Sequence, residues 1–180
     1  AFLCVGGIAP HKAQHELVTG FAVYRRVFDP RARLSLVGRI MAPGYGAALV
    51  SLISSLGLED AVELAGAVTH EQLVAYFRTA DGLVSVSDHE GFCVPLIEAM
   101  YLDVPVIAYR AGAVADTLGD GGLLIDSKEP SELATAMWRV VSDRALRSRL
   151  SQAAAARVKC FTLDRTRAAM SSVLREWMSS

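Results

Sequence analysis

The sequence has 180 residues, of which 52% are apolar and 21% charged, so it can form one globular domain with a sizeable core. The formal net charge is −1 and no dense run of Lys and Arg occurs, which excludes the usual electrostatic pattern of a protein that binds nucleic acid. The three cysteines are scattered, without the paired short spacing of a disulfide framework or a zinc site, and they favour a reducing, cytoplasmic setting.

The chain opens on an apolar run at residues 2–5 that is typical of a buried strand, with no methionine and no polar segment before it. We therefore expect residues 1–180 to be one domain excised from a longer chain. The most apolar stretch, residues 47–58, is too short to cross a bilayer. Any membrane contact is accordingly expected from the missing part of the protein.

Short apolar runs alternate with longer helical patterns, as in strand–helix–strand units that build a parallel sheet covered on both faces. The six predicted strands lie at residues 2–5, 34–37, 62–64, 82–86, 104–108 and 122–125. The sequence thus predicts an α/β fold: a doubly wound, Rossmann-like sheet of six parallel strands with C-terminal helices.

The predicted helices follow the strands. The first, at about residues 13–27, carries an apolar stripe that should lie on the sheet, formed by Leu17, Phe21, Tyr24 and Phe28. A second helix ends at Gly57, and a third is centred on residues 73–77. Three tail helices, expected to pack against the sheet, are predicted after Pro130, at 146–158 and at 166–178.

The loop after the first strand, GGIAPHK at residues 6–12, could hold phosphate. Gly6 and Gly7 permit close approach of the backbone, and Lys12 is predicted to open a helix. The loop lacks the Gly-x-Gly-x-x-Gly fingerprint of dinucleotide binding and the Gly-Lys-Ser/Thr ending of the nucleotide P-loop, so hydride transfer loses its main support. Taken alone, it is more often a plain turn with a solvated lysine.

The segment EGFCVPLIE at residues 90–98 follows the fourth strand and places two carboxylates around a predicted helix start. Pro95 is a good first helical residue because it lacks the N–H that a helix start leaves unpaired. Glu90 should then lie in the loop and Glu98 one turn into the helix. The unpaired N–H groups and positive dipole end near Val94 would stabilise phosphate oxygens.

Isolated glutamates are usually solvated or form capping and salt-bridge contacts, and that interpretation applies to Glu90 and Glu98 too. Glu98, however, lies between Ile97 and Ala99, so its carboxylate needs hydrogen-bond partners within an apolar patch. The hydroxyls of a ribose would supply them. The two glutamates could then grip different parts of one ligand.

These segments together resemble the donor-binding, C-terminal domain of retaining GT-B glycosyltransferases, in the group 1 type (family four) with two glutamates separated by seven residues. The resemblance covers nearly the whole chain. It rests on residues 90–100, from Glu90 to Met100, and on Gly-x-x-x-Pro-x-Lys at residues 6–12. Weaker agreement comes from residues 64–68, 80–81, 105–108 and 121–124.

The resemblance implies a role for each matching residue. Glu90 would contact hydroxyls of the donor sugar, Glu98 would bind the ribose, and Lys12 would neutralise the diphosphate as it leaves, so Glu90 and Lys12 are the candidate catalytic residues. The remaining donor-binding candidates act mainly through their backbone, at the diphosphate and sugar or at the base: Gly6, Gly7, Gly91, Phe92, Cys93, Val94, Gly66 and Val68.

The resemblance also implies a reaction. A hexose would pass from a UDP-, GDP- or ADP-sugar to an acceptor hydroxyl with retention, by front-face attack. No Asp-x-Asp element stands at the phosphate end of a predicted strand, so we expect no divalent metal, and we expect no other cofactor. The acceptor site would lie mostly on the missing N-terminal domain, so the isolated domain would bind donor without turning it over. Polysaccharide or glycolipid assembly, in the cytoplasm or at the inner face of the membrane, is the family-level expectation.

Two positions depart from the family pattern. Gly7 stands where many relatives have arginine, and Arg39 or a residue of the missing domain could compensate. Cys93 stands where many have glycine; a small buried side chain is favoured over a nucleophile, because no histidine is spaced to activate it. His89 could touch a sugar hydroxyl or only shape the loop.

Two other classes of function fit the same architecture. A sugar-nucleotide epimerase would need acid and base groups on both faces of the sugar, and a phosphorylase would need a lysine that holds a cofactor. Neither set of groups is placed convincingly by the sequence. A non-catalytic sugar-nucleotide-binding module would differ from a transferase domain only in the absence of a catalytic partner.

Overall fold

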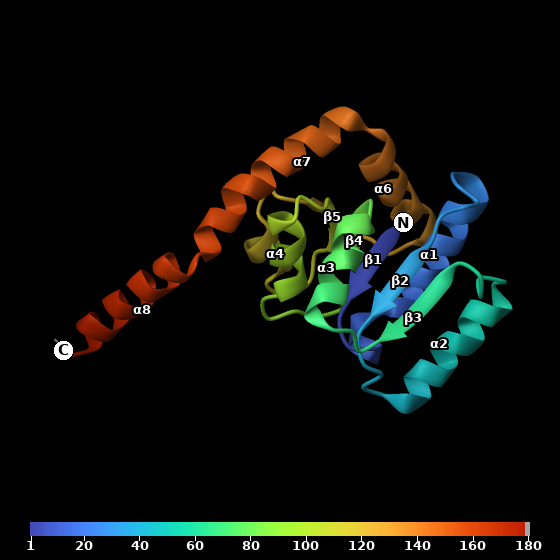
Figure 1. Ribbon diagram of the computed structural model, residues 1–180, viewed down its shortest axis with the longest axis horizontal. Helices are drawn as coiled ribbons and strands as arrows, with labels where there is room; N and C mark the ends of the chain where they lie inside the picture. The colour runs from blue at the N-terminus through green and yellow to red at the C-terminus, as the bar shows by residue number, and fades with distance from the viewer. Residues whose placement is uncertain (179–180) are drawn as a thin grey trace.

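The computed structural model describes residues 1–178, and a parallel sheet with helices on both of its faces forms its centre (Figure 1). The strands run in the order β3-β2-β1-β4-β5-β6, and every neighbouring pair is parallel. Their bounds are β1 Phe2–Val5, β2 Leu34–Val37, β3 Val62–Gly66, β4 Gly82–Ser85, β5 Val106–Tyr109 and β6 Leu123–Ile125. The predicted doubly wound α/β fold is confirmed.

Eight α-helices and two short 3₁₀ segments connect and extend these strands within the described residues. The helices that link the strands are α1 Gln14–Val27, α2 Pro43–Ser55, α3 His70–Thr79, α4 Val94–Tyr101 and α5 Val114–Leu118. The C-terminal helices are α6 Pro130–Ser142, α7 Arg144–Arg157 and α8 Leu163–Met178. The 3₁₀ segments are η1 Pro10–Lys12 and η2 Val158–Phe161.

The alternation of side chains along each strand divides the core into two layers. Phe2 and Cys4 of β1 belong to the cluster that includes side chains of α1, α2 and α6, whereas Leu3 belongs to the cluster formed with α3, α4 and α5. Leu17 and Phe21 of the predicted stripe on α1 are fully buried in the first cluster. Helices thus cover both faces of the sheet. A ligand can reach the sheet only beyond the ends of its strands.

The element boundaries differ from the prediction by one or two residues at most strands. β5 begins at Val106 rather than at residue 104, since Pro105 has no N–H to donate to a neighbouring strand. The short helix α5 was not predicted, because five residues are too few to show a helical period.

The start of the first helix differs more. Lys12 ends the 3₁₀ turn η1 instead of opening a helix, and Ala13 follows it in the left-handed conformation at φ 51°. α1 then begins at Gln14. The left-handed residue Ala13 changes the direction of the chain between Lys12 and α1. Lys12 therefore belongs to the loop and not to the helix.

The expectation that the tail helices pack against the sheet is correct for α6; α7 packs on other helices instead, and α8 packs on neither. α6 packs along α1 and near the sheet, and α7 packs against α4 and α6. All described residues of α8 are exposed, and Figure 1 shows this helix running away from the sheet. Its apolar side chains therefore do not join the core, which explains the difference.

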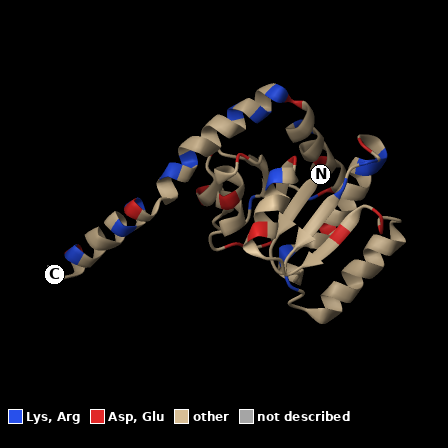
Figure 2. Cartoon of the chain, in the orientation of Figure 1, with Lys and Arg blue, Asp and Glu red and all other residues tan. Residues whose placement is uncertain are grey.

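Charge is unevenly spread over the elements. Lys and Arg recur along α7 and α8, whereas α2 carries no charged residue at all (Figure 2). Among the described residues, none of the helices combines the length and the apolar content needed to cross a membrane.

Candidate functional site

The strand order creates a crevice between the loops that follow β1 and β4. β1 and β4 are neighbours in the sheet, but the chain continues from β1 to β2 on one side and from β4 to β5 on the other. Loops that leave in opposite directions open a gap at the carboxyl ends of the strands, where ligands bind in folds of this type. Lys12 and Glu90 come from these two loops.

An ion pair joins the two loops. Lys12 Nζ lies 2.6 Å from Glu90 Oε1, and the two side chains are 24% and 10% exposed. Ser87 Oγ donates a second hydrogen bond to the same oxygen, at 2.7 Å. The fold thus brings together two predicted catalytic residues that lie 78 positions apart.

The Glu90 carboxylate is held in its charged form. Burial by itself raises its pKa, but hydrogen bonds from Lys12 and Ser87, together with the lysine charge, outweigh burial and lower the pKa below the ordinary value of 4.5. Near neutral pH Glu90 therefore accepts hydrogen bonds and cannot donate one.

Backbone contacts hold the loop that carries Glu90 from two directions. The N–H of Asp88 donates to the carbonyl of His11 at 2.8 Å, and the N–H of Ala113 donates to the carbonyl of Glu90 at 2.9 Å. Gly112 has φ 53°, and a Cβ there would lie 2.4 Å from the Glu90 carbonyl oxygen. Glycine at this position lets the loop after β5 support the loop after β4.

The loop with the two glycines is paired with the loop after β2. Ile8 donates its N–H to the Arg39 carbonyl at 2.8 Å and accepts at its own carbonyl from Met41 at 3.0 Å. A Cβ on Gly7 would meet Met41 Cγ at 2.7 Å. Gly6 is in contact range of the Lys12 stem, at 3.9 Å from Cε to a Cβ built on the glycine. The backbone here approaches its neighbours closely on both sides.

Helix α4 begins at Val94, one residue before the predicted Pro95, and its N-terminal cap is Cys93. Cys93 lies in the left-handed region at φ 63° and ψ 70°, which favours glycine. Burial, and after it the Glu90 charge, raise the pKa of the Cys93 thiol to about 11. The thiol is protonated near neutral pH, which disfavours a role as nucleophile.

A model of the family described as "Glycosyl transferases group 1" matches residues 1–157. The chain belongs to the group 1 glycosyl transferases. It is 32% identical to the D-inositol 3-phosphate glycosyltransferase of Streptomyces avermitilis in an alignment 181 positions long, which covers 95% of this chain and 38% of that protein.

Solved structures share the fold. HepE from Anabaena, in complex with UDP and glucose, matches with a TM-score of 0.86 and 24% identity over 97% of this chain and 48% of its own. Sucrose-phosphate synthase from Thermosynechococcus elongatus matches with a TM-score of 0.83 and 27% identity over 99% of this chain and 45% of its own. The chain therefore spans less than half the length of these relatives, and its fold is the Rossmann-like fold of GT-B glycosyltransferases.

The structure shows the surroundings of both departures from the pattern that the resemblance implies. A Cβ on Gly7 would lie 2.7 Å from Met41 Cγ, so an arginine there would have to displace the exposed side chain of Met41. The nearest backbone atom, the Arg39 carbonyl oxygen, would lie 3.8 Å away. Arg39 lies in the loop after β2 with its side chain exposed. At Cys93 the left-handed backbone explains why glycine suits the position.

Glu98 lies on α4, and among the described residues no hydrogen bond or ion pair joins it to Lys12 or Glu90. It is half-buried and lines an apolar cavity of about 480 Å³ between α3, α4 and η2, together with His70 and Ile97. Gly66 ends β3 with φ 68° and accepts a hydrogen bond from the Gly38 N–H at 2.9 Å. A short segment, residues 67–69, links Gly66 to α3, and α3 lines the same cavity as Glu98. The predicted base-binding and ribose-binding residues therefore lie near each other.

The residues that directly follow Glu90 are largely exposed, whereas Leu96, nearer to Glu98, is fully buried. Gly91 and Phe92 are exposed, Val94 is 53% exposed, and Cys93 is half-buried. The Phe92 ring meets Phe161 of η2 edge-on, with centroids 5.6 Å apart. Val68, by contrast, is half-buried against the second core cluster.

Two functional contacts were missed by sequence reasoning. Ser87 has a weak signal, since it precedes Glu90 by three residues in the same loop. Lys128 has none: it lies in the loop after β6, yet its ammonium contacts Asp88 beside the site and Glu16 on α1. Only the strand order brings these residues together.

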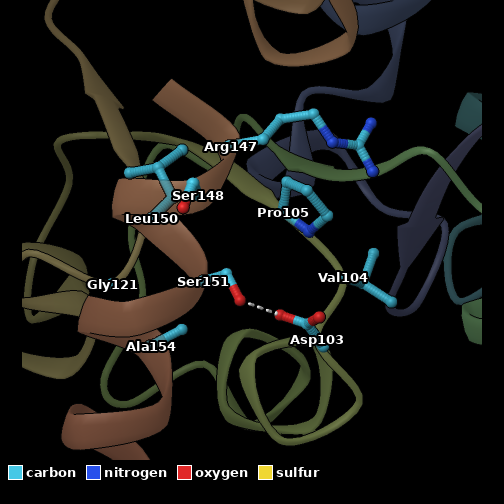
Figure 3. A pocket seen from close by; sticks show the side chains of 9 residues that line it. All are labelled: Asp103, Val104, Pro105, Gly121, Arg147, Ser148, Leu150, Ser151 and Ala154. Atoms are coloured by element: carbon cyan, nitrogen blue, oxygen red, sulfur yellow. Dashed lines mark hydrogen bonds between the residues drawn. The ribbon is translucent and has the colours of Figure 1, made fainter. Parts of the chain in front are cut away.

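A second cavity lies at the amino ends of the strands, whereas ligands in folds of this type bind at the carboxyl ends. It has a volume of about 210 Å³ and is lined by Asp103, Pro105 and Ser151 among others, next to the amino end of β5 (Figure 3). Figure 3 shows Ser151 Oγ donating to Asp103 Oδ1, a bond of 2.6 Å. This cavity is separate from the crevice at the carboxyl ends. Within residues 1–178, no cluster of three His, Cys, Asp or Glu side chains suited to a metal ion occurs.

Proposed function

We propose that this chain is the donor-binding domain of a retaining glycosyltransferase, which transfers a hexose from a nucleoside-diphosphate sugar to an acceptor hydroxyl. The observation that carries the proposal is the Lys12–Glu90 ion pair in the crevice between the loops after β1 and β4. The family and the complex of HepE with UDP and glucose support it. The acceptor site belongs, in this proposal, to a second domain outside these residues.

Lys12 and Glu90 divide the catalytic work. The Glu90 carboxylate accepts hydrogen bonds from hydroxyls of the donor sugar, which places the anomeric carbon. The ammonium of Lys12 has three donors, of which Glu90 takes one, so it can also meet a phosphate oxygen. As the bond to the diphosphate breaks, charge grows on that oxygen and the attraction to Lys12 grows with it.

Retention follows from front-face attack in this proposal. The acceptor oxygen forms its bond to the anomeric carbon on the face from which the diphosphate leaves, and the leaving phosphate oxygen takes the acceptor proton. The protein then needs no nucleophile, which agrees with the protonated thiol of Cys93. Lys12 supplies the positive charge, and we propose that no divalent metal or other cofactor takes part.

The nucleotide is held by the second glutamate and by backbone groups. Glu98 binds the ribose hydroxyls, and the base lies along Gly66 and Val68. The N–H groups from Gly91 to Val94 and those of Gly6 and Gly7 face the diphosphate and sugar, where the positive end of α4 adds to the attraction. Three free cysteines fit the cytoplasmic location that we propose, with membrane contact, if any, through the second domain.

Calorimetry of the chain with UDP, GDP and ADP, each with and without a linked hexose, tests this proposal. We expect one nucleotide to bind and its sugar conjugate to bind more tightly, because Glu90 contacts only the sugar. Failure of all three nucleotides and their conjugates to bind would contradict the proposal. Asp103→Asn, in the cavity at the opposite end of the sheet, is the matched control and should leave the affinities unchanged.

A further inference from the structure

Lys128 joins three elements at the carboxyl end of the sheet. It follows β6 and precedes α6, and its side chain is only 10% exposed. Its ammonium lies 2.9 Å from Glu16 Oε2 on α1 and pairs with Asp88 in the loop after β4. The same ammonium lies over the Tyr109 ring of β5, at 4.6 Å from the centroid. A lysine this buried is rare unless its charge is paired.

The Lys128 ammonium offsets the negative charges of two neighbouring carboxylates. Glu16 and Asp88 face the same cavity of about 510 Å³, which His15 and Glu129 also line. Burial lowers the pKa of Lys128, but its interactions with the carboxylates of Asp88 and Glu16 outweigh burial, so the pKa is raised and the ammonium keeps its charge. Without Lys128, the carboxylates of Glu16 and Asp88 would repel each other across the cavity.

Asp88 carries this constraint to the ion pair. Its backbone N–H donates to the His11 carbonyl, and His11 directly precedes Lys12. Asp88 is also two residues from Glu90 in the same loop. A shift of Asp88 therefore moves both partners of the Lys12–Glu90 pair.

We propose that Lys128 is a positioning residue for the donor sugar: by holding Asp88 against α1 it sets the geometry of the Lys12–Glu90 pair. This inference rests on the proposed function for its consequence in binding, although the constraint on the loop is present in the ligand-free chain. Lys128 itself touches neither Lys12 nor Glu90.

The first test is the pKa of Glu90 in the ligand-free chain, measured by NMR of its side-chain carboxyl carbon. Besides burial, the groups that set this pKa are Lys12, Ser87 and Cys93, so Lys128 acts on it through the loop. Lys128→Met keeps the apolar stem and removes the charge. We expect the Glu90 pKa to rise toward 4.5 in this variant. Arg149→Met, which removes a charge from an exposed position on α7, should leave it unchanged.

The second test is the affinity of UDP-glucose relative to UDP, measured by calorimetry on the same variants. Lys128→Met should reduce this ratio about five- to tenfold, the net contribution of one hydrogen bond, while UDP alone binds as before. Asp88→Asn, at an exposed side chain that the core does not need, should reduce the ratio similarly. The double variant should lose no more than Lys128→Met alone, because both changes break one link.

The outcomes separate this inference from the proposed function. If the unchanged chain binds neither UDP nor UDP-glucose, the proposed function fails for this donor, and the Glu90 titration still decides the role of Lys128. An unchanged Glu90 pKa in Lys128→Met would overturn the inference, as would equal losses in Arg149→Met. Should Lys128→Met not fold, an unchanged affinity ratio in Asp88→Asn would overturn it instead.

Discussion

The Glu90 carboxylate shows how one residue can be both structural and chemical. It is buried beside Lys12 and Ser87, yet it lies at the edge of the crevice where a ligand of this fold binds. Removal of one partner from a buried charge pair leaves the other charge unpaired, which usually costs more than the pair contributes. Substitutions here must therefore be tested on binding and on stability separately.

The division of roles between the two glutamates gives a binding prediction. Glu98→Gln should weaken binding of the free nucleotide, because the amide replaces a carboxylate at the ribose, by about 1–2 kcal/mol. Glu90→Gln should instead reduce only the additional affinity that the sugar provides. Calorimetry with the nucleotide and its sugar conjugate distinguishes the two, and equal effects of both substitutions on free nucleotide would refute the division.

The lowered pKa of Glu90 gives a pH prediction. Because the folded pKa lies below the unfolded value of about 4.5, the carboxylate stabilises the fold fully above pH 4.5, and this contribution is lost as the pH falls through the folded pKa. The difference in unfolding free energy between the unchanged chain and Glu90→Gln should thus be largest near pH 7 and shrink as the pH falls below 4.5. Denaturation at several pH values measures it, and a difference that does not change with pH would contradict the role of the charge.

The backbone at Cys93 gives a stability prediction. Cys93→Gly relieves the left-handed conformation but removes the side chain, whereas Cys93→Ala keeps the strained Cβ. We expect the glycine variant to be more stable than the alanine variant by about 1 kcal/mol. Chemical denaturation compares the two. A more stable alanine variant would show that the conformation at position 93 is not the controlling factor.

At the scale of elements, the site depends on loops that support each other. The loop after β4 contacts the loop after β1 through Asp88 and His11, and the loop after β5 through Gly112 and Ala113. Each of these loops follows a strand of the central sheet, whose side chains are buried on both faces. The sheet thus positions the starts of these loops, and short backbone contacts join the loops to one another.

Gly112 is the most direct test of this support. Gly112→Ala would place a Cβ 2.4 Å from the Glu90 carbonyl oxygen at a positive φ, so we expect a loss of about 2–3 kcal/mol of stability and a weaker sugar contact. Gly57→Ala is the matched control, since Gly57 has φ 64° but open space around its Cβ. It should lose only about 1 kcal/mol. Equal losses in thermal unfolding would show that the contact with Glu90 does not matter.

The prediction of elements from the sequence succeeded where the pattern is local. Apolar runs and helical periods located all six strands within two residues, because burial on both faces leaves near-continuous apolar runs. α5 is too short to show a period. The packing of α8 could not be predicted either. An apolar stripe indicates that one face of a helix can be buried, but it does not say whether this chain contains the surface that would bury it.

At the scale of the whole molecule, the chain spans less than half the length of the inositol-phosphate glycosyltransferase, HepE and sucrose-phosphate synthase to which it is similar. The proposed donor site is built from residues of this chain, and the proposed acceptor site is not. The apolar side chains of α8 are likewise exposed and lie outside the core of the domain.

This organisation predicts binding without turnover. The isolated chain should bind its sugar nucleotide and release no nucleoside diphosphate in an assay with acceptor, whereas the full-length protein should transfer the hexose. EDTA should leave the activity of the full-length protein unchanged, because Lys12 provides the charge at the diphosphate. A loss of activity in EDTA that Mg²⁺ restores would contradict the proposed absence of a metal, and transfer by the isolated chain would contradict the need for a second domain.

The sequence by itself determined the fold class and the two loops that carry the candidate catalytic residues. Apolar periodicity, glycine turns and a proline at a helix start can be recognised within a few neighbouring residues. The sequence could not determine which distant residues meet. That Lys12 reaches Glu90, that Gly112 supports the same loop, and that Lys128 holds Asp88 all follow from placing β4 beside β1 and β5 beside β4. Strand order arises from the packing of the whole chain, so only the tertiary structure decided these contacts.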